Sequence, residues 1–367
     1  MYNSELPQVS VLSIYRGKLT ENRGTPIRVR SLLERMVRDP RLSMTVASWD
    51  ETLPFSGATH VKLTNKKMDD FRALYSVVRQ HHIRVLIGHT MGTWYYSLFL
   101  KLFTRIKLVL EMHGFIEVEA RFYGSIGLLR YWIEHVVYSW FYRLCDLIIT
   151  CNPTAAEILS RYNRNIEIVL GGVDTKLFNP DVQPDPRVQN DSGTVLLGYA
   201  GNARKWQGVE FLRSAFKKMH QENPEFRLAI LSSESRGDLG GEGIQVLPGV
   251  PHENVPAFLA ACDVLVIPRL DDTVSRISFP SKLSEYMAMG KPVVASATSD
   301  AHRVIRDGVD GFVFPPGDTK AFIDTLQRLQ DPRLRREIGE QARHSAESFS
   351  WERQSDTMVR SVLKLIP

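Results

Sequence analysis

The stretch SFPSKLSEYMAMGKPVVAS, residues 278–296, predicts a helix that is followed directly by a buried strand. Ser278 is the expected N-cap, and Pro280 suits the first turn, where its missing N–H costs nothing. Gly290 can adopt the left-handed conformation that ends many helices. The apolar run Val293–Ala295 then forms a strand. A helix that leads into an apolar strand is the repeating unit of a parallel sheet in an α/β protein.

The same alternation of apolar runs and helical patterns extends to both ends of the chain. In each half it predicts a parallel, doubly wound sheet, whose ligands bind outside the carboxyl ends of the strands. A polar stretch with three prolines, residues 179–193, is typical of a linker between domains. The sequence thus predicts an α/β protein of two Rossmann-like domains facing across a cleft, residues 1–185 and residues 186–350.

Length and composition are those of an ordinary globular protein. The chain has 367 residues, of which 43% are apolar and 24% charged, so two domains are expected and a disordered chain is excluded. Its three scattered cysteines exclude a disulfide framework or a zinc site and suit a reducing cytoplasm. The first residues predict no signal peptide. No uncharged apolar stretch reaches the roughly 18 residues that a membrane span needs.

The net positive charge of the chain arises in its first half. The net charge is +5, and residues 1–185 carry 23 basic and 18 acidic side chains, whereas the remainder is balanced. No basic cluster is as dense as nucleic-acid binding requires, so no nucleic-acid partner is expected. Attraction to an anionic membrane or ligand and a merely solvated surface fit the excess equally well.

Two segments of the first half mix aromatic and basic residues. At helical spacing, residues 94–107 and residues 121–143 fit either a bilayer surface or the packed face of a helix. We expect the first segment to be core and the second to contact lipid. The protein is therefore expected in the cytoplasm, with salt-sensitive peripheral contact between its first half and the inner face of an anionic membrane.

The start of the helix predicted by the opening stretch is the strongest candidate for a ligand site. Its N-terminal amides, near Ser278, Pro280 and Ser281, can donate hydrogen bonds to an anion. Lys282 opposes the helix dipole in the first turn, and a bound diphosphate would remove that conflict. Glu285, one turn further on, is placed to accept two hydrogen bonds from the vicinal hydroxyls of a ribose.

The opening stretch resembles the donor-binding domain of the family 4 retaining glycosyltransferases. Four other segments agree with that family in order and spacing: LGGVDTKLFNP at 170–180, ACDVLVIP at 261–268, DGVDGFVFPPGD at 307–318 and FSW at 349–351. The resemblance covers nearly all of residues 8–365 and implies the GT-B architecture of two Rossmann-like domains. It also implies a last helix, residues 351–367, that returns to the first domain.

The resemblance implies an enzyme that moves a sugar from a nucleotide-diphosphate donor to a glycan or lipid-linked acceptor with retention of configuration, as in polysaccharide or lipopolysaccharide biosynthesis. It implies no cofactor and no metal ion. The adjacent Asp271 and Asp272 lack the Asp-x-Asp spacing of a metal site and are expected in a solvated loop. The sequence leaves open a UDP-sugar 2-epimerase of the same fold and a catalytically inactive nucleotide-sugar-binding subunit.

The catalytic positions of the family match three residues of this sequence. His113, at the end of an expected strand, would hydrogen-bond the donor sugar or its phosphate. Lys282 would stabilise the leaving diphosphate, and Glu285 would bind the donor. Further donor contacts are expected from the loops after strands and from the helix start. These contacts are Gly24, Thr25, Gly201, Asn202, Arg204, Lys205, Ser278, Pro280 and Ser281.

Two departures from the family pattern affect this site. Ile277 stands where the family usually has the first glutamate of a Glu-x7-Glu pair, so backbone amides near residues 275–278 are expected to hold the sugar. Asn202 and Gln207 stand where the family often has an arginine and a lysine. The diphosphate is then left to the three cations Arg204, Lys205 and Lys282.

Other candidates in the first half carry less information. His89, at another strand end, resembles an acceptor-side position of the family. Arg28 and Arg30 follow the glycine-bearing first loop. For both arginines a solvated helix face is as consistent with the sequence as a ligand contact.

Overall fold

The structure is a computed structural model that describes residues 8–22, 24–191, 193–233 and 239–366. It consists of two compact units. Unit 1 comprises Met1–Leu170 and Trp351–Pro367, and unit 2 comprises Gly171–Ser350. Residues 1–7, where no signal peptide is expected, lie outside the described residues.

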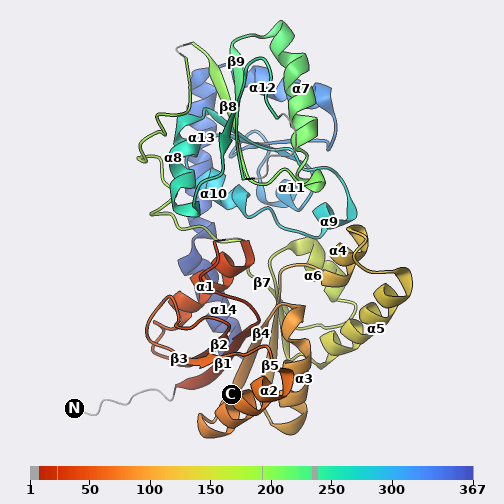
Figure 1. The fold of residues 1–367 in the computed structure, drawn as a ribbon. Coiled ribbons are helices and arrows are strands. Elements are labelled where there is room, and N and C mark those ends of the chain that lie inside the picture. Colours follow the sequence, from red (N-terminus) through yellow and green to blue (C-terminus); the bar gives the residue numbers. More distant parts are fainter. Residues whose placement is uncertain (1–7, 23, 192, 234–238, 367) are drawn as a thin grey trace, which may run out of the picture. The chain divides into compact units, whose positions relative to one another are not determined.

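Unit 1 is built on a seven-stranded parallel sheet in the order β3-β2-β1-β4-β5-β6-β7 (Figure 1). The chain reverses its winding direction between β1 and β4, where Tyr15 pairs with His89 at the carboxyl ends of both strands. In such sheets this reversal point holds the ligand crevice. The strands are β1 (Val9–Tyr15), β2 (Leu42–Ser48), β3 (Thr59–Lys62), β4 (Val85–His89), β5 (Lys107–Met112), β6 (Leu147–Thr150) and β7 (Ile166–Ile168).

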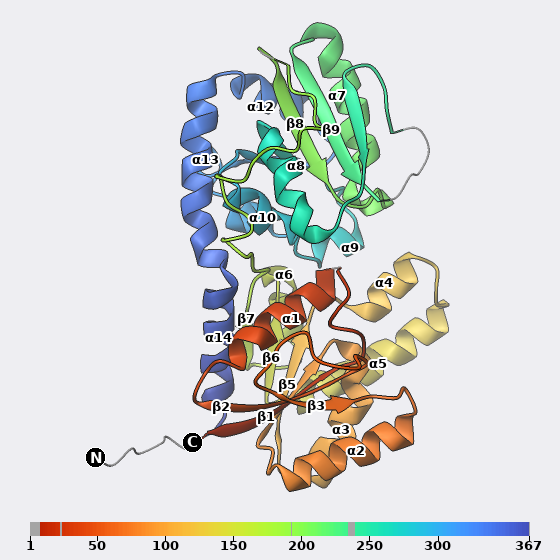
Figure 2. The same ribbon diagram turned by 60° about the vertical axis from the view of Figure 1, so that its left-hand side comes forward.

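Helices cover both faces of this sheet (Figure 2). On one face α1 packs against α14, and their apolar side chains share a core with alternate residues of the strands. On the other face α2, α3 and α5 lie side by side, because Phe71 contacts Phe99 and Trp94 contacts Tyr138. The helices are α1 (Gly24–Met36), α2 (Lys67–Gln80), α3 (Trp94–Phe103), α4 (Ile116–Phe122), α5 (Leu128–Leu144), α6 (Pro153–Leu159) and α14 (Trp351–Leu363).

Unit 2 repeats the plan with a six-stranded parallel sheet in the order β10-β9-β8-β11-β12-β13. Its winding reverses between β8 and β11. The strands are β8 (Val195–Ala200), β9 (Phe226–Ser232), β10 (Ile244–Pro248), β11 (Val264–Ile267), β12 (Val293–Ser296) and β13 (Phe312–Phe314). The helices are α7 (Val209–Glu222), α8 (Val255–Ala261), α9 (Thr273–Arg276), α10 (Lys282–Ala288), α11 (Ala301–Val304), α12 (Thr319–Arg328) and α13 (Pro332–Ala346).

These two sheets confirm the predicted α/β fold class. The chain passes between the units at Leu170 and Gly171, before the boundary expected at residue 185. Residues after Gly171 belong to unit 2 because the Gly171 carbonyl accepts a hydrogen bond from Ser284, and the Asp185 N–H donates to the Ala257 carbonyl. The proline-bearing stretch is therefore partly packed on unit 2 rather than a free linker.

Among the described residues, none of the helices has both the length and the apolar character to cross a membrane.

Candidate functional site

In unit 2 the chain makes tight turns where β8 and β11 end. Gly201 follows β8 at φ +148°, and a Cβ there would lie 2.6 Å from the Lys282 Nζ. Gly208, at φ +73°, approaches β11 so closely that a Cβ would lie 1.8 Å from the Pro268 carbonyl oxygen. Both positions require glycine. The two glycines bring the loop after β8 against the end of β11 and onto Lys282.

Lys282 lies at the centre of this region. Its ammonium group donates to the Gln207 Oε1 at 3.2 Å and lies 4.2 Å from the centre of the Tyr199 ring. Burial and the positive charge of Arg269 lower the pKa of Lys282 from its usual 10.5 to about 7, against the opposing charge of Glu285. The charged form of Lys282 is thus disfavoured, and an anion beside it would restore its proton.

Arg269 is a second cation, placed two residues after β11. Its Nη1 donates to the Ser278 carbonyl at 2.9 Å and to the Ser299 hydroxyl at 3.0 Å, and its guanidinium lies 4.5 Å from the centre of the Trp206 ring. The side chain is 4% exposed. Ser299 follows β12 in a left-handed conformation, φ +55°. Loops after three neighbouring strands, β8, β11 and β12, therefore converge on two cations.

Glu285 lies on α10, one turn after Lys282. Its Oε1 accepts a hydrogen bond from the Nε2 of His252 at 2.8 Å, and both side chains are half-buried. His252 follows β10, and its ring lies 5.3 Å from that of Phe178. An ionised carboxylate only accepts hydrogen bonds, so Nε2 carries the proton in this pair. The histidine thereby fixes the orientation of the carboxylate.

The start of α10 differs from the sequence prediction. The helix begins at Lys282 with Ser281 in the N-cap position and no side-chain capping bond, so Ser278 is not the N-cap. Ser278 instead precedes the helix and accepts from Arg269, while Pro280 is buried. The helix is therefore shorter at its N-terminal end than the sequence predicted.

The amides of residues 275–278 were expected to hold a sugar, and this interpretation is wrong. The Ser275 N–H donates to Asp272, which caps α9, and the next three amides donate to carbonyls of the same turn. Ile277 is buried in the core rather than directed at a ligand. Asp271 is exposed and pairs with Arg276, so the two aspartates serve the local turn.

The remaining predicted residues of unit 2 lie around the Gly201 turn. The Asn202 carbonyl accepts from the Tyr199 hydroxyl at 2.7 Å, and its side chain accepts from the Arg204 N–H. Arg204 and Lys205 are exposed at the surface end of this loop. The structure therefore places Gly201, Asn202 and Lys282 together, with the two exposed cations further out.

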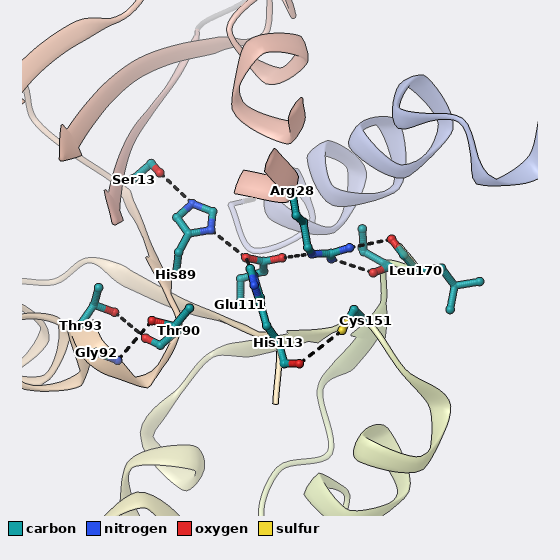
Figure 3. A network of polar contacts seen from close by, with 11 residues as sticks. Ser13, Arg28, His89, Thr90, Gly92, Thr93, Glu111, His113, Cys151 and Leu170 are labelled. Atoms are coloured by element: carbon teal, nitrogen blue, oxygen red, sulfur yellow. Dashed lines mark hydrogen bonds and ion pairs between the residues drawn. The ribbon is translucent and has the colours of Figure 1, made fainter. Parts of the chain in front are cut away.

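In unit 1 a buried carboxylate organises the carboxyl ends of the strands (Figure 3). Glu111 of β5 is fully buried, and its Oε2 accepts from His89 Nδ1 at 2.8 Å and from His113 Nε2. The other nitrogen of His89, Nε2, lies 2.8 Å from the Ser13 hydroxyl of β1. Ser13, His89, Glu111 and His113 thus form one hydrogen-bonded chain across three adjacent strands.

Arg28 completes this network from α1. Its Nε donates to Glu111 Oε1 at 2.7 Å, and its two terminal nitrogens donate to the carbonyls of Leu170 and Val169 (Figure 3). Arg28 is buried, so neither of the two alternatives open from the sequence describes it. Burial alone would raise the pKa of Glu111, but His113 and Arg28 hold it well below the usual value.

His113 is half-buried at the end of this chain of contacts. Burial lowers the pKa of His113 in spite of the adjacent Glu111 charge, so the imidazole is neutral at neutral pH. Because Nε2 carries the proton that is donated to Glu111, Nδ1 is left as a hydrogen-bond acceptor. A neutral histidine held in this tautomer can accept a hydrogen bond from a hydroxyl group.

His89, Glu111 and His113 each offer a metal-ligand atom, and these atoms lie within 4.8 Å of one another. In this structure both histidine nitrogens instead donate protons to the same carboxylate oxygen. Arg28 occupies the other carboxylate oxygen and adds positive charge. A divalent cation would have to displace both protons beside a buried guanidinium, so the donor set fits a hydrogen-bonded network better than a metal site.

Gly24 and Thr25 form the start of α1, one turn before Arg28. Gly24 is exposed, with no atom within 4 Å of the position of a Cβ. Arg30 donates to the Leu19 carbonyl and so holds the preceding loop instead of lying on a solvated face. These residues share the sheet edge of the Glu111 network.

Sequence reasoning missed three contributors to these sites. Arg269 was detectable because it directly follows an apolar strand. Glu111 is the one charged residue between the ends of the apolar run LVLEM, which signals a buried role. His252 gave no such signal, because its pairing with Glu285 joins residues 33 positions apart that only the tertiary fold brings together.

The geometry on both units defines a class: α/β proteins in which two doubly wound sheets each carry a polar site at their carboxyl edges. A model described as "Glycosyl transferases group 1" matches residues 194–331, and one described as "Glycosyltransferase Family 4" matches residues 53–177. Together these matches cover every strand of the unit 2 sheet and β3 to β7 of the unit 1 sheet, and only β1 and β2 lie outside them. The chain belongs to the family 4 glycosyltransferases.

Relatives and solved structures agree with this assignment. A D-inositol 3-phosphate glycosyltransferase of Arthrobacter sp. (strain FB24) is 27% identical over 234 residues, which are 59% of this chain and 54% of that protein. The chain thus spans about half the length of such curated relatives. A glycosyltransferase from Rickettsia africae shares the fold with a TM-score of 0.77 at 14% identity, covering 100% of this chain and 99% of that one. Anabaena HepE in complex with UDP and glucose has a TM-score of 0.73 at 15% identity, covering 97% and 100%. The fold is therefore GT-B.

Proposed function

We propose that this protein transfers a sugar from a nucleotide-diphosphate donor to a hydroxyl group of a glycan or lipid-linked acceptor, with retention of configuration. The proposal rests on the position of Lys282 at the strand ends of unit 2. There, burial and the charge of Arg269 lower the pKa of its ammonium group to about 7. A diphosphate would supply the missing negative charge. The complex of the structurally similar HepE with UDP and glucose supports this donor class.

Within this proposal, Lys282 and Arg269 stabilise the negative charge that grows on the diphosphate as the sugar leaves. Glu285, oriented by His252, accepts hydrogen bonds from the ribose through its carboxylate. His113 accepts a hydrogen bond from a sugar hydroxyl through Nδ1, a role that the family resemblance suggests. The cations already provide the charge that a metal ion would supply, so we propose that transfer requires no metal.

Thermal-shift measurements with UDP-, GDP- and ADP-sugars test the donor class. A donor at 100 times its Kd stabilises the protein by about 2.7 kcal/mol, which is readily measured. The stabilising donor is then incubated with the protein, with and without EDTA, and the products are analysed by NMR. Transfer or hydrolysis with an unchanged anomeric configuration, insensitive to EDTA, is expected. Epimerised donor without transfer would indicate the 2-epimerase, and binding without turnover the inactive subunit.

We also propose that the protein acts in the cytoplasm, with peripheral contact between unit 1 and the inner face of the membrane. The support is the excess of basic residues in the first half of the chain.

A further inference from the structure

The exposed apolar surface of the protein is concentrated on one layer of helices. Single exposed apolar residues are normal on any protein, but contiguous groups mark interaction surfaces. Of the 19 large apolar side chains exposed among the described residues, 16 lie between Met68 and Leu144 of unit 1. Only Ile168, Val246 and Val309 lie elsewhere. This distribution singles out the outer face of α2, α3, α4 and α5. The expectation that residues 94–107 are core is therefore wrong for Phe99, Leu102 and Phe103.

Helix α5 carries the densest part of this surface. Its exposed apolar residues recur at every fourth position: Leu128, Trp132, Val136, Trp140 and Leu144. The residue that follows each of the first three is apolar and exposed as well, and exposure reaches 76% at Leu129. Each four-residue step turns the row by about 40° around the helix axis, so these residues wind across the outer half of α5. We call this row the α5 stripe.

The opposite side of α5 is fixed to the sheet. Tyr138, Phe141 and Tyr142 are buried, and Trp94 of α3 contacts the first two rings. The helix therefore cannot leave unit 1 to cross a membrane, and 17 residues would be short for a span. It is placed to lie flat, with its inner side on the protein and its stripe outward.

Basic groups border the stripe. Arg121 and Arg143 are exposed at the end of α4 and in the last turn of α5, and neither has an ion pair among the residues that the structure describes. Arg130 is also exposed, although it pairs with Glu134. Tryptophans between arginines are typical of helices that lie in the interface of a bilayer. An anionic lipid surface is complementary to both features.

A basic hollow continues this surface beyond α3. Phe103, which is 65% exposed, lines a cavity of about 730 Å³ together with Arg79, Arg84, Arg105 and Lys107. No carboxylate is among the described residues that line it. Lys107 pairs with Asp146 at 3.5 Å, so the three arginines are the cations that phosphate groups of lipids beside Phe103 would meet.

We infer that the α5 stripe and the adjacent end of α3 dock unit 1 onto an anionic bilayer, with Trp132 and Trp140 inserted among the acyl chains. Apolar insertion contributes most of the binding, and the arginines add to it. Added salt should therefore weaken this binding without abolishing it, because 16 large apolar side chains are exposed between Met68 and Leu144.

Docking in this way also bears on the acceptor. Helix α4 starts at Ile116, directly after His113 and Gly114, and packs against α5. A docked α5 therefore holds the strand end of the Glu111 network close to the lipid interface. Because the proposed function allows a glycan or a lipid-linked acceptor, this step, which rests on that proposal, selects the lipid-linked class.

Flotation with vesicles tests the docking surface. The full chain is mixed with vesicles of phosphatidylcholine alone, or of phosphatidylcholine with phosphatidylglycerol, at low salt and at 0.5 M NaCl. We expect the protein to bind both kinds of vesicle, and to bind more tightly when phosphatidylglycerol is present. At 0.5 M NaCl, binding to the anionic vesicles should fall to that seen with phosphatidylcholine alone. Release of the protein from all vesicles by salt would overturn the apolar part of the inference.

Paired variants locate the surface. Trp132→Ser with Trp140→Ser should weaken partition at least about tenfold, since two large apolar side chains no longer enter the bilayer. The matched control, Val246→Ser with Val309→Ser on unit 2, should bind like the wild type. Brominated acyl chains should quench the fluorescence of the wild type and the control but not of the Trp variant. Equal binding by all three proteins would overturn the inference.

Two further measurements distinguish membrane docking from self-association of the chain and from a failure of the proposed function. Light scattering without vesicles should show no oligomer; an oligomer that the Trp variant dissolves would assign the stripe to a second copy of the chain. Stabilisation by a nucleotide sugar should be equal in wild type and Trp variant, which also shows that the variant is folded. If no nucleotide sugar binds while vesicles do, the proposed function fails and the docking surface stands.

Discussion

The two units treat a buried charge in opposite ways. In unit 1 the charge of Glu111 is stabilised by Arg28 and two histidines, and its pKa is held well below the usual value. In unit 2 the charge of Lys282 is disfavoured by burial and by Arg269, and its pKa falls to about 7. A charge that the protein satisfies by itself supports the scaffold, whereas a charge left unsatisfied is available to a ligand of opposite sign.

The largest effect is expected on the stability of the protein when the Glu111 charge, which Arg28 and the histidines satisfy, is removed. Glu111→Gln removes the charge partner of buried Arg28 and should lower the free energy of unfolding by about 3–5 kcal/mol. Urea unfolding measures this loss. Glu34→Gln breaks the exposed pair between Glu34 of α1 and Arg38, which follows that helix, and should cost about 0.3–0.5 kcal/mol.

A loss of less than about 1 kcal/mol for Glu111→Gln would show that the carbonyls of Val169 and Leu170 satisfy Arg28 without the carboxylate. The contrast between the units would then be one of hydrogen bonding rather than charge.

The next largest effect is expected on catalysis when Lys282, whose charge the protein leaves unsatisfied, is replaced. Lys282→Ala should lower kcat by about 10²–10³, because the ammonium group opposes charge that develops only as the diphosphate leaves. Steady-state kinetics with the stabilising donor check this, and Lys218→Ala, exposed on α7 of the same unit, is the matched control. A raised KM with normal kcat would mean that Lys282 acts on the bound donor alone.

A smaller effect is expected at the carboxylate beside Lys282. Glu285→Ala should weaken donor binding by about 1–3 kcal/mol, the cost of losing hydrogen bonds to a charged acceptor. Calorimetry measures the donor Kd, with Glu210→Ala on the exposed side of α7 as control. Unchanged affinity would leave Glu285 as a structural partner of His252 and remove it from the donor site.

The comparison also shows what the sequence could and could not predict. Local patterns determine strands: the apolar run Val293–Ala295, predicted to be a strand, is β12, which ends one residue later at Ser296. The N-cap of α10 was placed wrongly at Ser278, because both the carbonyl and the hydroxyl of that residue accept from Arg269, which follows another strand. Capping preferences consider only neighbours in sequence and cannot include such a contact.

The candidate sites follow the same rule. Lys282 and Glu285 lie on one short helix, so their proximity was predictable from spacing. The Arg28–Glu111 pair joins residues 83 positions apart, and the His252–Glu285 pair joins residues 33 apart. Which charges end up paired depends on how strands and helices pack. The sequence therefore predicted which charged residues share one helix, but not which charges the protein neutralises by itself.

The smallest expected effect, at most about 1.4 kcal/mol for each pH unit, is a change of donor affinity with pH, and it distinguishes the satisfied charge of Glu111 from the unsatisfied charge of Lys282. The pKa of Lys282 is about 7 in the folded protein and near 10.5 when unfolded, so between these values the unfolded chain binds more protons. Without donor, this group makes the protein more stable as pH rises through that window. Donor binding has the opposite sign, because the diphosphate favours the protonated form. Affinity should be flat below about pH 7 and fall by up to about tenfold per pH unit above it.

Titration calorimetry from pH 6 to 9 measures this profile with a nucleotide sugar, whose diphosphate does not titrate in that range. Repeating it in buffers of different ionisation enthalpy should show proton uptake above pH 7. Lys282→Arg keeps a permanent charge and should give a flat profile with no proton uptake. Glu111, whose charge is already satisfied, should add nothing to the profile, since its pKa lies well below this range. A wild-type profile as flat as that of Lys282→Arg would show that Lys282 is charged before the donor arrives. The difference between the two units would then vanish.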